Sequence, residues 1–144
     1  MEENQVSNTS LWKAYMRSYH SRHATDKIFD DFLGCDLVPK ELRERIEQQI
    51  IPEIFLPGTS NIVSRARYTE DNLVEAIRHG VKQYVILGAG MDAFAFRRSD
   101  LMEQLRVFEV DHPTTQEYKL RRFAELGWKY TENLHFIPID FTNT

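Results

Sequence analysis

The stretch Tyr84-Val-Ile-Leu-Gly-Ala-Gly-Met-Asp-Ala-Phe-Ala-Phe-Arg-Arg98 gives the clearest indication of how this chain folds. The apolar run from Tyr84 to Leu87 is typical of a buried strand, and an apolar helical stretch follows the Gly88-Ala-Gly90 turn. Glycine at such a turn lets the backbone approach a ligand that a Cβ atom would hold off. The N-terminus of the following helix offers unpaired N–H groups. The stretch predicts a strand, a binding loop and a helix; we call residues 88–92 the glycine loop.

A second strand follows and ends in a carboxylate. Residues 106–110 form the strand, and Asp111 comes roughly 20 residues after the glycines, the spacing at which nucleotide-binding α/β folds hold ribose hydroxyls. Glu109 is an alternative ribose ligand, but Asp111 lies at the carboxyl end of the strand, where ligands bind in open α/β sheets. Asp111 could also cap the helix that Pro113 begins. The pattern predicts a site for an adenosine-containing cofactor.

The glycine pattern fits two kinds of cofactor. Gly88-Ala-Gly90-Met-Asp-Ala93 satisfies the dinucleotide form G-x-G-x-x-G/A, which would indicate a nicotinamide or flavin enzyme. A pyrophosphate, however, needs unobstructed N–H groups at the helix start, and Asp92 would place a carboxylate close to that dianion. S-adenosylmethionine has no phosphate and carries a sulfonium cation, which tolerates a nearby acid. The local chemistry favours S-adenosylmethionine, and an NAD(P)-dependent oxidoreductase is the alternative.

Several short strings resemble one family of methyltransferases. They are Arg65-Ala-Arg-Tyr68, Leu87-Gly-Ala-Gly-Met-Asp92, Phe96-Arg97 and Phe108-Glu-Val-Asp111. Together they resemble the leucine carboxyl methyltransferase family, which contains protein carboxyl methyltransferases and bacterial O-methyltransferases. Asp92 stands where class I methyltransferases commonly have a third glycine, as is typical of this family. Tyr15-Met-Arg17-Ser-Tyr-His20 is similar to the polyketide-type bacterial branch, and the resemblance covers the chain from about its first helix onward.

The resemblance implies roles for residues on both sides of the glycine loop. Arg65 is implied as the partner of the methionyl carboxylate, because a guanidinium can fork onto both oxygens. Arg67, two positions along, is the competing residue. Asp140 and the backbone of Phe141 are implied to recognise the adenine amino group. The predicted cofactor site comprises Arg65, Gly88, Ala89, Gly90, Asp111, Asp140 and Phe141.

Periodicity predicts a helical first part and an α/β second part. We expect helices at residues 11–20, 40–51, 61–79 and 113–126, a turn at residues 57–60, and parallel strands at 83–87, 106–110 and 134–139. The fold class is α/β, and the resemblance implies a Rossmann-like class I methyltransferase fold with an N-terminal helical layer and the first three parallel strands. Residues 1–80 form the helical segment and residues 81–144 the first half of the S-adenosylmethionine-binding domain, within one incomplete domain overall.

Three strands are few for the implied fold, whose sheet normally has seven. We therefore expect the 144 residues to be the N-terminal part of a larger enzyme, in which residues after Thr144 supply the other strands and most of the substrate pocket. A three-stranded parallel sheet leaves apolar edge exposed. We expect the chain to fold poorly alone or to self-associate through the exposed sheet edge.

Composition argues against several classes of function. The formal net charge is −4, without a basic block, so nucleic-acid binding has no electrostatic support. No apolar run approaches the roughly 20 residues of a membrane span, and the acidic N-terminus is unlike a signal peptide. The single cysteine, Cys35, fits a reducing cytoplasm. His20 and His23, with Asp26 nearby, are weak evidence for a metal site, and no metal is predicted.

The predicted reaction is in-line transfer of the S-adenosylmethionine methyl group to an oxygen nucleophile. The sulfonium is already activated, so the protein mainly supplies proximity, alignment and exclusion of water. The acceptor is a small molecule or a carboxylate-bearing group; a carboxylate needs no general base, whereas a phenol or enol would need one from beyond Thr144. No catalytic residue is assigned. Lys13 and Arg17 of the first helix could also reach the cofactor, but neither is assigned to the site. A non-catalytic remnant that binds a nucleoside or a protein is the third hypothesis.

Overall fold

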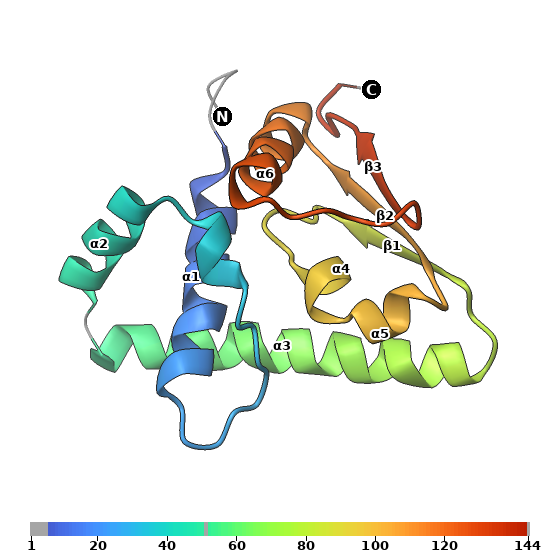
Figure 1. Ribbon diagram of the computed structural model, residues 1–144. Coiled ribbons are helices and arrows are strands. Elements are labelled where there is room, and N and C mark those ends of the chain that lie inside the picture. Colours follow the sequence, from blue (N-terminus) through green and yellow to red (C-terminus); the bar gives the residue numbers. More distant parts are fainter. Residues whose placement is uncertain (1–5, 51, 144) are drawn as a thin grey trace.

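Helices form the first part of the chain and an α/β arrangement the second. The computed structural model describes residues 6–50 and 52–143, so the acidic stretch at residues 1–5 lies outside the described part. The elements are α1 (Asn8–His23), the 3-10 helix η1 (Gly34–Leu37), α2 (Lys40–Gln49), α3 (Pro52–Arg78), β1 (Gln83–Leu87), α4 (Phe94–Arg97), α5 (Ser99–Met102), β2 (Arg106–Asp111), α6 (Pro113–Leu126) and β3 (Leu134–Pro138). Figure 1 shows α3 along the base of the molecule, under both α1 and the strands.

The three strands form a parallel sheet in the order β1-β2-β3, which confirms the predicted α/β fold class. Tyr84, Val107 and Leu134 are in register, and this face packs against apolar residues of α3, α4 and α5. The neighbouring β1 residues Val85 and Leu87 are 53% and 71% exposed. The edge strand β1 thus carries exposed apolar side chains, as expected, and self-association through it stays a prediction.

The ends of α6 follow from local sequence. Pro113 occupies the first turn, where a missing N–H costs nothing, and the His112 side chain accepts a hydrogen bond from the Thr114 N–H at 3.2 Å. At the other end Gly127 adopts φ +70°, and the Trp128 N–H reaches the Phe123 carbonyl at 2.9 Å. The predicted bounds of this helix are confirmed.

Helix α3 begins at Pro52, so the predicted turn at residues 57–60 is wrong. Proline inside a helix removes one backbone hydrogen bond, which is why the sequence favoured a break there. Packing against α1 outweighs that local cost: Thr59 is 3% exposed, and a Cβ atom on Gly58 would lie only 3.1 Å from the Met16 Cε. The helix predicted at residues 40–51 ends at Gln49, and Ile51 lies outside the described residues.

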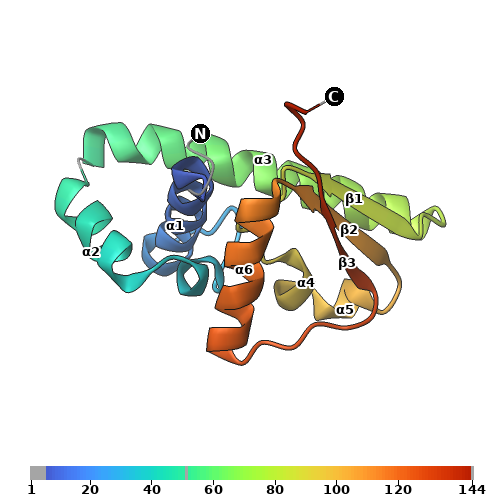
Figure 2. The same ribbon diagram turned by 90° about the horizontal axis from the view of Figure 1, so that it is seen from above.

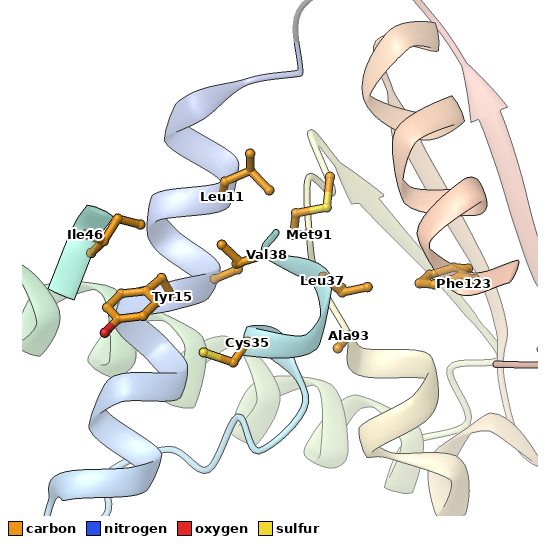
Figure 3. Close-up of a cluster of buried hydrophobic side chains, with 10 residues drawn as sticks. Leu11, Tyr15, Cys35, Leu37, Val38, Ile46, Met91, Ala93 and Phe123 are labelled. Atoms are coloured by element: carbon orange, nitrogen blue, oxygen red, sulfur yellow. The ribbon is translucent and has the colours of Figure 1, made fainter. Parts of the chain in front are cut away.

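One core cluster joins the helical part to the glycine loop. Figure 3 shows Leu11 and Tyr15 of α1 on one side of the cluster, and Leu37 with Met91 and Ala93 of the segment after β1 on the other. All five side chains are buried. Figures 1 and 2 place α6 between α1 and β3, and its Phe123 completes this cluster. The loop is therefore built into the core that α1 helps to form.

Candidate functional site

The glycine loop has the backbone geometry that only glycine adopts readily. Gly88 has φ +66° and Gly90 has φ +52°, both in the left-handed region. The N–H groups of Gly88 and Ala89 donate to the Val110 carbonyl at 2.8 and 3.4 Å. The loop thus turns directly over the end of β2, the strand that ends in Asp111.

Asp111 holds the glycine loop with its side chain. One carboxylate oxygen accepts the Gly90 N–H at 2.5 Å, and the other accepts the His112 N–H at 2.7 Å. The helix cap is His112 itself, so the suggested capping role of Asp111 is wrong. A carboxylate has about four lone-pair sites, so about two remain for other donors.

Glu109, the alternative ribose ligand, is buried beneath α6. Its side chain is 2% exposed and binds the Lys119 Nζ at 2.6 Å, inside the interface with α6. Burial raises the pKa of Glu109, and the Lys119 ammonium opposes this shift. A carboxylate enclosed in this way is part of the core and is not presented to a ligand.

Asp140 lies beside Asp111 at the carboxyl ends of the strands. The Ile139 N–H donates to the Asp111 carbonyl at 2.8 Å, which extends the pairing of β3 with β2. Asp140 then lies 3.7 Å from His112 Nε2. Hydrogen bonds from the Thr142 hydroxyl and N–H lower the pKa of Asp140, so it is ionised at neutral pH. Phe141 is 58% exposed beside it.

Arg65 faces a separate cavity between α1, α3, β1 and α4. The cavity has a volume of about 260 Å³, and its basic lining residues are Lys13, Arg17, Arg65 and Arg97. The acids Glu70 and Asp92 also line it. Arg67 does not contribute to the lining and instead pairs with Asp71 at 2.6 Å on the exposed side of α3. Of the two candidate arginines, Arg65 is the one that lines the cavity.

Two of the four cations in the cavity are already neutralised. Arg97 binds Glu70 through two nitrogens at 2.8 and 3.2 Å, and Arg17 binds Asp31 at 2.9 Å. Within residues 6–50 and 52–143, neither Lys13 nor Arg65 has an ion-pair or hydrogen-bond partner. Their positive charges are therefore available to an anionic group.

The Asp92 carboxylate accepts a hydrogen bond at the N-terminus of the helix that follows the glycine loop. The donor is the Phe94 N–H at 2.6 Å, and Phe94 is the first residue of α4. The apolar helical stretch predicted after the loop forms the two four-residue helices α4 and α5. The N-terminus expected to offer open N–H groups is thus occupied by an acid in this structure.

The predicted residues fall into two groups. Asp111 and Asp140 meet the glycine loop at the carboxyl ends of the strands, whereas Arg65 lies in the cavity, which reaches the loop through Asp92. Lys13 and Arg17, which the sequence suggested as cofactor contacts and left unassigned, also line the cavity. The available signal was their spacing of four positions, which places both on one face of α1.

The two histidines with metal-ligand spacing serve local contacts. His20 Nε2 accepts the Ile28 N–H at 3.0 Å, and the His23 ring stacks on Tyr19 at 3.9 Å between centroids. Among the described residues no group of three or more His, Cys, Asp or Glu side chains could hold a metal ion. Likewise, no helix in the described part is both long and apolar enough to cross a membrane.

Comparison with known sequences identifies the family. The sequence profile of the leucine carboxyl methyltransferase family matches residues 10–144. This match covers nearly the whole chain, so the protein belongs to the leucine carboxyl methyltransferase family, as the strings around Arg65 and the glycine loop indicated.

Individual relatives agree with this assignment. The chain is 40% identical over 169 aligned residues to YktD of Bacillus subtilis (strain 168), whose name describes it as a candidate S-adenosyl-L-methionine-dependent methyltransferase. Relatives with the same description in Mycolicibacterium smegmatis and Mycobacterium tuberculosis H37Rv are 35% and 38% identical over 114 and 82 residues. The alignment with YktD covers all of this chain and 55% of YktD. The alignment with the Mycolicibacterium smegmatis relative covers 79% of this chain and 34% of that protein. For the Mycobacterium tuberculosis relative, the shares are 57% of this chain and 26% of that protein. The chain thus spans about half of YktD and less of the others.

Proposed function

We propose that this chain is the cofactor-binding part of an S-adenosylmethionine-dependent O-methyltransferase. Family membership supports the general reaction, and the fold supplies a glycine loop, a carboxylate at the end of β2 and a cationic cavity. The observation that carries the choice of cofactor is the bond from the Phe94 N–H to Asp92. Because a carboxylate occupies the start of α4, a pyrophosphate would meet negative charge where dinucleotide sites offer free N–H groups.

The adenosine end of the cofactor fits the strand ends. The lone pairs that remain on Asp111 suit ribose hydroxyls, since a hydroxyl donates to an ionised carboxylate in a strong hydrogen bond. Asp140, which is ionised, and the exposed Phe141 follow on the neighbouring strand and suit an adenine amino group and ring. We assign these three residues and the glycine loop to adenosine.

The amino-acid end of the cofactor fits the cavity. Arg65 and Lys13 approach it from different helices and have no partner in the described part of the chain, so a carboxylate would find two cations. Asp92 lines the same cavity and suits an ammonium group. We therefore assign Arg65 to the methionyl carboxylate, and Arg67 is left to its surface ion pair with Asp71.

S-adenosylmethionine supplies an activated methyl group on a sulfonium. An acceptor oxygen forms the new O–C bond while the S–C bond breaks, and the electron pair stays on sulfur, which leaves as a neutral thioether. The residues of this chain bind and orient the cofactor for that displacement. The acceptor oxygen belongs to a carboxylate, which is ionised at neutral pH and requires no general base, or to a hydroxyl, which requires one.

Calorimetric titration of the purified chain tests the proposal. We expect S-adenosylhomocysteine, the reaction product, to bind saturably and NADH not to bind. Arg65→Ala should weaken binding by roughly tenfold, because one charged hydrogen-bond partner is lost. Arg67→Ala removes the same charge from the exposed side of α3 and should leave the affinity unchanged.

Other outcomes would contradict the proposal in distinguishable ways. Saturable binding of NADH alone would indicate the oxidoreductase. A folded chain that binds neither ligand would favour the non-catalytic remnant. If Arg65→Ala and Arg67→Ala lower the S-adenosylhomocysteine affinity equally, the assignment of Arg65 to the methionyl carboxylate is refuted. The choice of S-adenosylmethionine as the cofactor would not be affected.

A further inference from the structure

Helix α1 packs directly on the glycine loop. A Cβ atom on Gly90 would lie 2.7 Å from the Ser10 Oγ, so the loop passes α1 at a distance that only glycine allows. One residue further on, Met91 is 1% exposed and belongs to the same buried cluster as Leu11. The shape of the loop therefore depends on a helix that lies far from it in sequence.

Arg17 adds a polar contact between α1 and the loop. Its Nη2 donates a long hydrogen bond of 3.5 Å to the Met91 carbonyl, and its Nε donates to the Asp31 carboxylate at 2.9 Å. The Arg17 side chain is 15% exposed and lines the cavity that Arg65 also lines. One guanidinium thus contacts the loop, the buried acid and the cavity wall.

Asp31 provides a fixed support for Arg17. Its side chain is 2% exposed, and its other carboxylate oxygen accepts the Gly34 N–H at 2.9 Å. Its backbone N–H donates to the Ser21 Oγ at 2.6 Å, and its carbonyl accepts the Ser18 hydroxyl at 2.9 Å. Bonds on every side hold this carboxylate in place, so it can fix the orientation of the guanidinium in turn.

We propose that Arg17 is a positioning residue for cofactor binding, which holds the Met91 peptide of the glycine loop against the buried Asp31. This inference rests on the proposed function. The loop is then fastened at two successive residues: Asp111 holds the Gly90 N–H, and Arg17 holds the Met91 carbonyl. A loop fixed in its bound shape before the ligand arrives loses less entropy on binding, so its affinity is higher.

The test compares two arginine-to-lysine variants of α1 in the full 144-residue chain. Arg17→Lys keeps the charge beside Asp31 but has no planar fork to reach two acceptors at once. Arg22→Lys is the matched control, because Arg22 contacts the Ser18 carbonyl and the Cys35 Sγ on the same helix. We expect Arg17→Lys to weaken S-adenosylhomocysteine binding by roughly tenfold and Arg22→Lys to leave it within twofold.

Amide NMR shifts of the ligand-free chain give a readout that does not depend on the cofactor. The signals of residues 88–92 should move in Arg17→Lys and stay in place in Arg22→Lys. If Arg17→Lys unfolds the chain, the double variant Arg17→Gln/Asp31→Asn, which leaves no unpaired buried carboxylate, replaces it in both measurements. Unchanged loop signals together with unchanged affinity would overturn the inference. Failure of the unsubstituted chain to bind would overturn the proposed function, and the NMR comparison would still decide whether Arg17 holds the loop.

Discussion

The Gly90 N–H donates to the Asp111 carboxylate at 2.5 Å, so two residues predicted to hold the cofactor hold each other. The second carboxylate oxygen accepts the His112 N–H at 2.7 Å. Asp111 therefore orders the loop after β1 and the turn after β2 at the same time. Any ligand bound at its remaining lone pairs would contact a carboxylate that the backbone has already oriented.

This double role predicts a large effect of removing the Asp111 side chain. Asp111→Ala deletes a ligand of the ribose and the support of Gly90, so S-adenosylhomocysteine affinity should fall by about 100-fold or more. Asp111→Asn keeps one acceptor oxygen and should lower the S-adenosylhomocysteine affinity by roughly tenfold. Titration calorimetry measures both. Glu117→Ala removes an exposed acid from α6 and is the control for the change in charge; if all three variants bind alike, Asp111 is not at the cofactor site.

The two glycines of the loop should respond differently to a methyl group. Gly88→Ala, at φ +66° with open space around its Cβ position, should cost about 1 to 2 kcal/mol of unfolding free energy from backbone strain alone. Gly90→Ala, at φ +52°, also drives a Cβ atom against Ser10 and should cost about 1 to 3 kcal/mol more. Urea unfolding curves of both variants measure the difference.

A double-mutant cycle isolates the clash. Ser10→Gly removes the hydroxyl and the Cβ atom that a methyl group on Gly90 would meet at 2.7 and 3.0 Å. In that background Gly90→Ala should cost the same as Gly88→Ala. An undiminished cost would show that contact with α1 does not shape the loop.

Local sequence signals predicted the strands and the last helix. Short apolar runs between polar residues located β1 and β2, and β3 was predicted one residue too long. Pro113 and Gly127 bounded α6, because each has a strong conformational preference of its own. The glycine spacing and the position of Asp111 likewise predicted which loop and which strand end would meet.

Contacts between distant segments explain what could not be predicted. The break expected at Pro57 is absent because Gly58 packs against Met16 of α1, a neighbour that no local pattern reveals. The hydrogen bond from the Phe94 N–H to Asp92 depends on where α4 begins, which the local sequence does not specify. Arg17 reached the loop only through the packing of α1 on Met91.

The buried Lys119–Glu109 pair predicts a strong and pH-dependent loss of stability. The two side chains are 1% and 2% exposed and 2.6 Å apart. Lys119→Met leaves the carboxylate without its partner and should cost about 3 to 5 kcal/mol of unfolding free energy at pH 7. Burial raises the pKa of Glu109, and loss of the ammonium raises it further. A raised folded-state pKa means that the folded variant takes up a proton first, so stability should recover as the pH falls from 7 towards 5.

The double variant Glu109→Leu/Lys119→Met distinguishes this explanation from a simple packing defect. With neither charge present, no unpaired carboxylate is buried. Most of the lost stability should return at pH 7, and the dependence on pH between 5 and 7 should match that of the unsubstituted chain. Urea unfolding at several pH values measures both variants. If the double variant is as unstable as Lys119→Met, the fault lies in packing and not in the unpaired acid.

Tyr84 predicts a loss of stability at high pH. Burial raises the pKa of Tyr84 to about 12 from its usual value of 10.0, and the carboxylate of Asp92 raises it as well. The unfolded chain therefore releases this proton before the folded chain does, so the unfolding free energy falls as the pH rises from 10 to 12. Tyr84→Phe keeps the edge contact with Phe94 and has no proton to lose, so it should match the unsubstituted chain at pH 8 and exceed it by about 1 kcal/mol at pH 11. Other tyrosines with a raised pKa, such as Tyr118, are present in both proteins. Their contributions therefore cancel in the difference between the two unfolding free energies. Equal pH dependence of the two proteins, measured by urea unfolding, would show that Tyr84 ionises freely and that the cavity wall it forms is open to solvent.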